Sequence, residues 1–325
     1  MLLKRIIIYI SMQKNKTRKK TLITCVKIII SAALIYWLFK RVDWKQMWEQ
    51  LHNVSWAFLA AYVIFQILGN IISAKKWQII AGFKELHFTL KESFFVYVTG
   101  SFINNFMPSM IGGDAYRSLW LAKRSGAKAA SLSTVVFDRF IGFWTIALLA
   151  LILSPFLFSF AEKNAVLYFT LVVLAAFFVI DLVIIYMYRQ PWFRHFILRI
   201  PFRKITRLFE ESAFYAKKHI WLQSSLWSVL FIFVGVALSN FMLFRAIGSD
   251  LNFIPFLNVI FLVTIASMIP LSINNIGIKE WAYVTFFGLL GVSVETAITV
   301  ALLARFLQMF ISFIALPTYL STRDK

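Results

Sequence analysis

Residues 108–117 read Pro-Ser-Met-Ile-Gly-Gly-Asp-Ala-Tyr-Arg, and they interrupt the end of an apolar stretch that runs from Glu92 to Ile111. A second apolar stretch, Phe253–Ile276, is interrupted in a similar way by Pro-Leu-Ser-Ile-Asn-Asn at residues 270–275. Proline removes a backbone donor and clashes with the preceding helical turn, and irregular backbone is tolerated at membrane depth only inside protein or around water. Both stretches therefore predict re-entrant broken helices, with two ordinary kinked spans as the alternative.

Six uninterrupted apolar runs surround these breaks, each near the ~20 residues that a helix needs to cross a hydrocarbon core ~30 Å thick. The runs are Thr21–Phe39, Val54–Ser73, Ala129–Leu153, Ala165–Tyr188, Gln223–Ile247 and Thr296–Leu316. Of the 325 residues, 60% are hydrophobic and 15% are charged, which is more apolar surface than one soluble core can hide. The sequence predicts an all-α polytopic membrane protein with six full transmembrane helices, and it excludes an ordinary soluble enzyme.

The two breaks are followed by similar patterns, in which two glycines precede an arginine at intervals of 13 residues after the first break and 14 after the second. These residues are Gly113, Gly126 and Arg139, and then Gly277, Gly291 and Arg305. Each copy also follows two full spans, so each half has three crossings and the second half is inverted. The expected halves, 21–153 and 164–318, match the plan of transporters that bind cargo at the midplane between inverted repeats.

The formal net charge is +20, and the basic residues concentrate before the first run and in the connections within 75–128 and 189–218. When the broken stretches enter and leave on the same side, all of these connections face the cytoplasm together with both termini. Orientation then accounts for the charge, so no nucleic-acid partner is inferred. A single cysteine and four scattered histidines permit no disulfide and no zinc site, and we expect no cofactor.

Three segments make up the expected organisation: a basic N-terminus at 1–20, one transmembrane domain at 21–318 and a cytoplasmic tail at 319–325. Within the domain, the connection Arg189–Leu222 alternates basic and aromatic residues, as an amphipathic helix on an anionic cytoplasmic leaflet would. The same connection is also suited to docking a separate glycosyltransferase or synthase.

The two arginines of the repeat are predicted to lie near the bilayer centre, because Arg139 stands ~15 Å into its span and Arg305 about as deep from the other face. A central arginine costs at least ~2.5–3.5 kcal/mol, so both side chains should face an interior cavity rather than lipid. Guanidinium presents a planar fork of donors that suits phosphate, which indicates an anionic headgroup site. The alternative is internal ion pairing with Asp138, Asp181 or Glu280.

The residues around the breaks are further candidates for binding the headgroup. Glycines at a helix start leave backbone donors free and allow close approach to a phosphate, whereas a tight re-entrant turn would use the same residues for packing alone. The candidates are Gly112, Gly113, Asp114 and Arg117 in the first copy, and Gly277, Lys279 and Glu280 in the second. Asp181, alone in an apolar run, is a candidate to carry a coupling proton or to form a helix contact.

At these positions the chain resembles the lysylphosphatidylglycerol synthase transmembrane region family, also called flippase-like or uncharacterised protein family 0104. The resemblance rests on Pro108, Gly112, Gly113, Asp114, Arg117, Gly126, Asp138, Arg139, Gly277, Glu280, Gly291 and Arg305. It implies an eight-segment bacterial or archaeal inner-membrane protein, similar to the flippase half of the multiple peptide resistance factor, which moves aminoacylated phosphatidylglycerol between leaflets. Lys279 and the pair Asn274 and Asn275 depart from the family pattern. Because the sequence stops at Lys325, we expect no synthase activity.

The expected function is a lipid translocator in which Arg139 and Arg305 hold an anionic or aminoacylated phospholipid, or a polyprenyl-phosphate-linked lipid. Neutralising either arginine should then reduce transport more than folding. One rival is an integral-membrane transferase, which would need clustered carboxylates for a metal and has only Asp114 and Asp138 on the cytoplasmic half. A second rival is a non-transporting scaffold for a separate glycosyltransferase or synthase, recruited through Arg189–Leu222.

Overall fold

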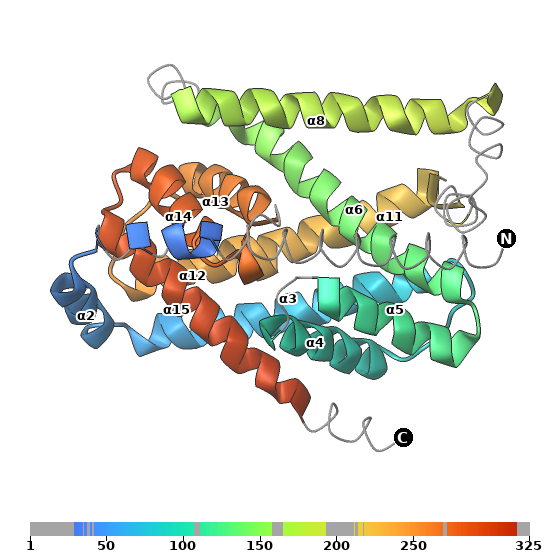
Figure 1. The fold of residues 1–325 in the computed structure, drawn as a ribbon, viewed down its shortest axis with the longest axis horizontal. Helices are drawn as coiled ribbons and strands as arrows, with labels where there is room; N and C mark the ends of the chain where they lie inside the picture. The colour runs from blue at the N-terminus through green and yellow to red at the C-terminus, as the bar shows by residue number, and fades with distance from the viewer. Residues whose placement is uncertain are drawn as a thin grey trace, which may run out of the picture.

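The computed structural model of the chain describes residues 29–34, 36–37, 40, 42–106, 111–157, 165–192, 211, 214–216, 218–268 and 272–316. Every regular element within these ranges is helical (Figure 1). Most of the predicted first span, both prolines of the breaks and most of the 189–222 connection lie outside the described residues, as does the side chain of Asp181.

The principal helices follow one another with short connections. They are α2 (Trp44–His52), α3 (Trp56–Gly82), α4 (Leu90–Phe106), α5 (Ile111–Ser125), α6 (Lys128–Leu153), α8 (Ala165–Arg189), α11 (Lys218–Phe231), α12 (Ser239–Ala246), α13 (Phe253–Met268), α14 (Ile278–Phe287) and α15 (Val294–Ser312). A π-helical segment, η3 (Ile232–Leu238), joins α11 to α12, and 3-10 turns η1 (Ser154–Leu157), η2 (Phe214–Ala216), η4 (Ile273–Asn275), η5 (Gly288–Leu290) and η6 (Phe313–Ala315) cap or connect the other helices.

Four helical stretches of the described chain are long and apolar enough to cross a membrane. They are Trp56–Gly82, Lys128–Phe156, His219–Ala246 and Val294–Ala315, and shorter apolar stretches cover Leu167–Ile180 and Phe253–Met268. Helix α3 extends nine residues beyond the predicted end at Ser73. The prediction stopped there because two lysines follow, but Lys76 is only 5% exposed and is held inside the protein by an ion pair described below.

Helices α4 and α5 form a hairpin whose two ends meet, because Glu92 in the first turn of α4 pairs with Arg124 in the last turn of α5. Helices α13 and α14 form a second hairpin, in which Phe256 near the start of α13 packs on Phe287 at the end of α14. Figure 1 shows the first hairpin beside the ends of the bundle where α3 stops and α6 starts, and the second beside the opposite ends, where α12 stops and α15 starts. Both interrupted stretches are thus helical hairpins that enter the bundle from opposite ends.

Glycines allow the closest helix crossings. At the crossing of α4 and α5, a Cβ added to Gly113 would lie 2.2 Å from the carbonyl oxygen of Gly100. Where α3 crosses the π-helical segment, a Cβ on Gly69 would lie 2.5 Å from the Cα of Gly235. Gln66 donates there to the Gly235 carbonyl at 3.2 Å. Small residues and interhelical hydrogen bonds are the usual means of holding helices together in a membrane.

We expect Gly113→Ala to lower the thermal stability of the purified protein, because the added methyl group must push α4 and α5 apart. Overpacking of this kind costs about 1–3 kcal/mol. The matched control is Gly82→Ala at the end of α3, where an added Cβ meets no atom within 4 Å. Thermal unfolding in detergent measures both variants, and equal melting temperatures for the two would contradict the tight crossing.

Candidate functional site

A buried ion-pair cluster links α3, α5 and α6. Asp138 of α6 receives Arg117 Nη2 of α5 on its Oδ2 at 2.8 Å, and its Oδ1 lies 3.0 Å from Lys76 Nζ of α3. All three side chains are at most 6% exposed. The Arg117 guanidinium is also flanked by two aromatic rings, with the Trp77 centroid at 4.5 Å and the Tyr97 centroid at 4.6 Å. This cluster joins three helices inside the protein and is closed to a ligand in this arrangement.

This cluster corrects the assignment of Lys76 and Arg117 to cytoplasmic connections. The charge count placed them there because lysine and arginine are expected in loops. In the structure both lie within helices, where a carboxylate and aromatic faces compensate their charge. Sequence reasoning also missed Lys76 as a member of the site, since a lysine at the edge of an apolar run gives no signal of its buried partner.

A second ion pair adjoins the buried cluster and reaches the surface of the protein. Arg139 of α6 donates from Nε to Asp114 Oδ2 at 2.9 Å and from Nη2 to Asp114 Oδ1 at 3.0 Å. This two-point contact is the strong form of an arginine–carboxylate pair. The Arg139 side chain is 46% exposed and that of Asp114 is 21% exposed. An incoming anion therefore has access to this pair, unlike the cluster around Asp138.

The equivalent pair of the second hairpin is closed more tightly. Arg305 of α15 donates from Nε to Glu280 Oε1 at 3.0 Å, from Nη1 to the Asn274 carbonyl at 3.0 Å and from Nη2 to the Asn275 carbonyl at 3.1 Å. Glu280 is 1% exposed and also accepts the Gly277 amide at 2.7 Å. The Arg305 guanidinium thus ties the break of the second hairpin to the start of α14.

The backbone of this break needs unusual conformations. Asn274 and Asn275 have φ angles of 49° and 55°, and Gly277 has a φ of 86°. A Cβ at Gly277 would lie 2.3 Å from the Cβ of Leu34, which shows that the first predicted span packs against this turn. The asparagine pair and the glycine are therefore explained by turn geometry and close packing. Beside this turn, Lys279 Nζ lies 3.4 Å from the amide oxygen of Gln308 on α15.

The two ion pairs occupy matching places in the sequence and in the helices. Asp114 and Arg139 are 25 residues apart, and so are Glu280 and Arg305. Each carboxylate lies in the first turn of a hairpin's second helix, and each arginine stands eleven residues after the first residue of the next helix, Lys128 or Val294. At 1.5 Å per residue that depth is ~16 Å, near the middle of a span. The ion pairs match more closely than the glycine spacing that first indicated a repeat.

Comparison with known proteins places this arrangement in a family. Residues 25–315 match the family described as the lysylphosphatidylglycerol synthase TM region. The chain belongs to that family. It is also 31% identical over 130 residues to the UPF0104 membrane protein MJ1595 of Methanocaldococcus jannaschii, an alignment that covers 39% of this chain and 38% of that protein. Membership and the apolar helices together establish a multi-pass integral membrane protein.

The predicted glycines have packing roles in this member of the synthase TM region family. Gly113 touches Gly100, and its amide donates to Asn104 Oδ1 at 2.7 Å, so that donor is occupied. Gly112 lies next to it in the first turn of α5 and is partly buried. The neighbouring Asn105 donates to Ser312 Oγ of α15 at 2.7 Å, which joins the end of α4 to the second half of the chain. The structure thus gives both asparagines near the first break specific partners that the sequence did not indicate.

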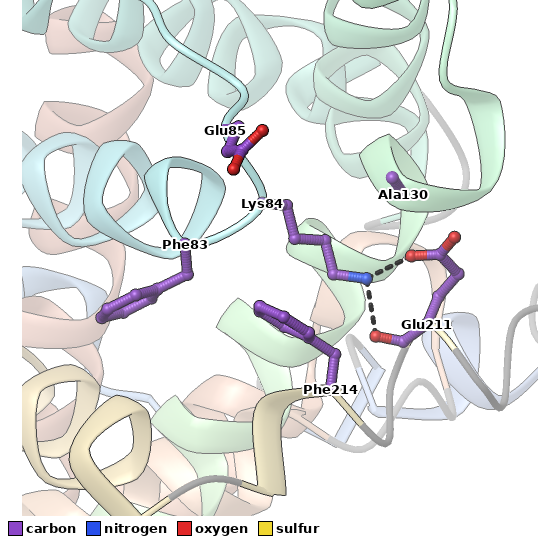
Figure 2. A pocket seen from close by; sticks show the side chains of 6 residues that line it. All are labelled: Phe83, Lys84, Glu85, Ala130, Glu211 and Phe214. Carbon is purple, nitrogen blue, oxygen red and sulfur yellow. Dashed lines mark hydrogen bonds and ion pairs between the residues drawn. The ribbon is translucent and has the colours of Figure 1, made fainter.

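A pocket of about 420 Å³ lies at the end of α3 and contains none of the predicted site residues. Figure 2 shows Lys84 pointing toward Glu211, whose backbone carbonyl accepts from the ammonium at 2.7 Å and whose carboxylate pairs with it. The remaining lining residues are Phe83, Glu85, Ala130 and Phe214. Because its lysine is already neutralised, the pocket is less suited to an anionic headgroup than the Arg139 pair. It does attach the described part of the 189–222 connection to α3.

Proposed function

We propose that this protein is a lipid translocator that moves a phosphate-bearing lipid between the leaflets of a bacterial or archaeal inner membrane. The observation that supports the proposal most directly is the Asp114–Arg139 pair, which combines a position about halfway along a span with 46% exposure of the arginine. An arginine facing lipid at that depth is strongly unfavourable. A polar groove or cavity that admits a headgroup accounts for both properties.

The proposed architecture has six full spans and two re-entrant hairpins in two inverted repeats, with both termini in the cytoplasm. The α4–α5 hairpin, closed by Glu92 and Arg124, supports re-entry because its start and its end lie together. The second hairpin lies beside the opposite ends of the bundle (Figure 1), as inversion requires. Inverted repeats with discontinuous helices are a common plan for alternating access.

In this proposal, Asp114 occupies Arg139 while no lipid is bound, and a lipid phosphate takes its place during transport. Phosphate oxygens match the guanidinium fork as a carboxylate does, so the arginine exchanges one anion for another without being left unpaired. The buried cluster around Asp138 keeps α6 in register with α3 and α5 while this exchange takes place. A carrier must release what it binds, and the resident carboxylate supplies the competing partner that allows release.

Headgroup translocation in liposomes tests the proposal. We expect wild type to accelerate the flipping of fluorescent phosphatidylglycerol and Arg139→Gln to lose at least about 90% of the acceleration, since one charged hydrogen-bonding partner contributes ~1.5–3 kcal/mol. The matched control is Arg245→Gln, which removes an exposed arginine paired with Asp250 at the end of α12. Unchanged flipping in Arg139→Gln, or equal losses in both variants, would overturn the role of Arg139.

Cysteine accessibility tests the topology. In a Cys25→Ser background, we expect a membrane-impermeant maleimide to label Trp48→Cys on α2 in intact cells, and to label Lys91→Cys and Lys123→Cys only after permeabilisation. The two lysines flank the first hairpin and are both exposed. Labelling of Lys91→Cys and Lys123→Cys from opposite sides would show that α4 and α5 together cross the membrane as a kinked span.

The same preparation distinguishes the two rival functions. A membrane transferase would convert its lipid substrate in a manner that a chelator abolishes, because such chemistry generally relies on a metal. A scaffold would lose its cellular function when residues 189–222 are deleted, while Arg139→Gln would have no effect. Flipping that persists in chelator and depends on Arg139 would support the translocator over both.

A further inference from the structure

The charges within the first hairpin and its neighbouring helices do not balance. Lys76, Arg117 and Arg139 form ion pairs with two carboxylates, Asp114 and Asp138, which leaves an excess of one positive charge. The four residues between α4 and α5, at 107–110, are Met-Pro-Ser-Met and add no charge. Arg139 is the most exposed of the three cations, so the excess charge is presented where a ligand has access.

The second hairpin has the same excess. Lys279 and Arg305 stand against a single carboxylate, Glu280, and the residues at 269–271 are Ile-Pro-Leu. Glu280 is already engaged by Arg305, whereas the polar partner that the structure shows for Lys279 is the uncharged amide of Gln308. The two hairpin regions together therefore hold two positive charges more than negative ones. Asp181 lies on α8, which is outside both hairpins.

The carboxylates of these regions are also unable to receive a cationic headgroup. Asp138 is 3% exposed and holds two cations, and Glu280 is 1% exposed and holds Arg305 and a backbone amide. Asp114 is the most exposed of the three, and the Arg139 fork occupies both of its oxygens. An ammonium group would meet two surplus cations and, within the described hairpins, no unoccupied carboxylate.

We propose that the cargo is a lipid phosphate whose headgroup carries net negative charge and no ammonium group. This inference rests on the proposed translocator function. Phosphatidylglycerol and a polyprenyl phosphate share this chemistry. Lysyl-phosphatidylglycerol does not, because its two ammonium groups give it a net positive charge. The unbalanced cations reject it through like-charge repulsion, which is how interfaces often exclude a close analogue.

The test compares lipids and charge variants in phosphatidylcholine liposomes. Each preparation contains phosphatidylglycerol, lysyl-phosphatidylglycerol, phosphatidylethanolamine or undecaprenyl phosphate, and both headgroup flipping and lipid affinity are measured. We expect flipping of phosphatidylglycerol, of undecaprenyl phosphate or of both, and none of the two amine-bearing lipids. Inorganic phosphate serves as a competitor, and binding of free phosphate without movement of either anionic lipid would overturn a lipid cargo.

Lys279→Gln tests the charge argument itself. We expect its affinity for the anionic lipid to fall about tenfold, the effect of one unit charge ~10 Å away at an effective dielectric of ~20. Lys279→Arg should restore the affinity because it keeps the charge. Lys45→Gln, an exposed lysine on α2, should leave it unchanged. An unaltered affinity in folded Lys279→Gln would overturn the inference.

The outcomes separate this inference from the function on which it rests. If lysyl-phosphatidylglycerol moves as fast as phosphatidylglycerol, the charge preference is wrong and the translocator stands. If no lipid is moved by wild type, both proposals fail.

Discussion

Asp138→Asn is expected to destabilise the folded protein by about 3–5 kcal/mol, the usual consequence of removing one partner from a buried ion pair. The substitution keeps the shape of the side chain but removes the charge that compensates Lys76 and Arg117, both of which are nearly inaccessible to solvent. Neither cation has another printed carboxylate within 3 Å, since the nearest alternative for Arg117 is Asp114 at 3.5 Å. Two buried charges would thus lose most of their compensation.

Thermal unfolding in detergent, together with the yield of monodisperse protein, measures this effect. Asp250→Asn is the control, because it removes the same charge from an ion pair whose carboxylate is 85% exposed. Exposed pairs of this kind contribute little to stability. If the melting temperatures of the two variants were equal, the ion pairs around Asp138 would not be the connection between α3, α5 and α6 that the structure indicates.

Arg305→Gln is expected to have the second largest effect, again about 3–5 kcal/mol, and to act on folding rather than only on transport. The substitution leaves Glu280 buried without its cation and removes the donors for the carbonyls of Asn274 and Asn275. Those asparagines have positive φ angles, so the turn depends on outside contacts to hold its conformation. This expectation replaces the equal treatment of Arg139 and Arg305 that the sequence suggested.

Comparison of four variants tests the difference between the arginines. We expect Arg305→Gln to lower the melting temperature strongly and Arg305→Lys to recover part of the loss, since lysine restores the charge but not the planar fork. Arg139→Gln and Arg139→Lys should unfold close to wild type, because Asp114 remains accessible to water. A melting temperature that falls as far in Arg139→Gln as in Arg305→Gln would show that the two pairs have the same structural role.

Much of the fold was accessible to sequence reasoning because the bilayer imposes simple length and polarity rules. The apolar runs predicted α6, the α11–α12 stretch and α15 within a few residues, and the breaks marked both hairpins. The end of α3 was wrong, because a buried lysine cannot be distinguished from a loop lysine without knowledge of its partner. The family resemblance was confirmed by the match over residues 25–315.

The sequence by itself determined that apolar helices cross a membrane, that two of its stretches are broken, and that two arginines lie deep within spans. These properties depend on the order of residues along one segment, which lipid and backbone hydrogen bonding read directly. Only the tertiary structure decided which carboxylate meets which cation. Asp138 and Arg139 are neighbours in sequence, but successive residues of a helix point about 100° apart. One therefore closes a buried junction of three helices, while the other faces the accessible side, where a headgroup can bind.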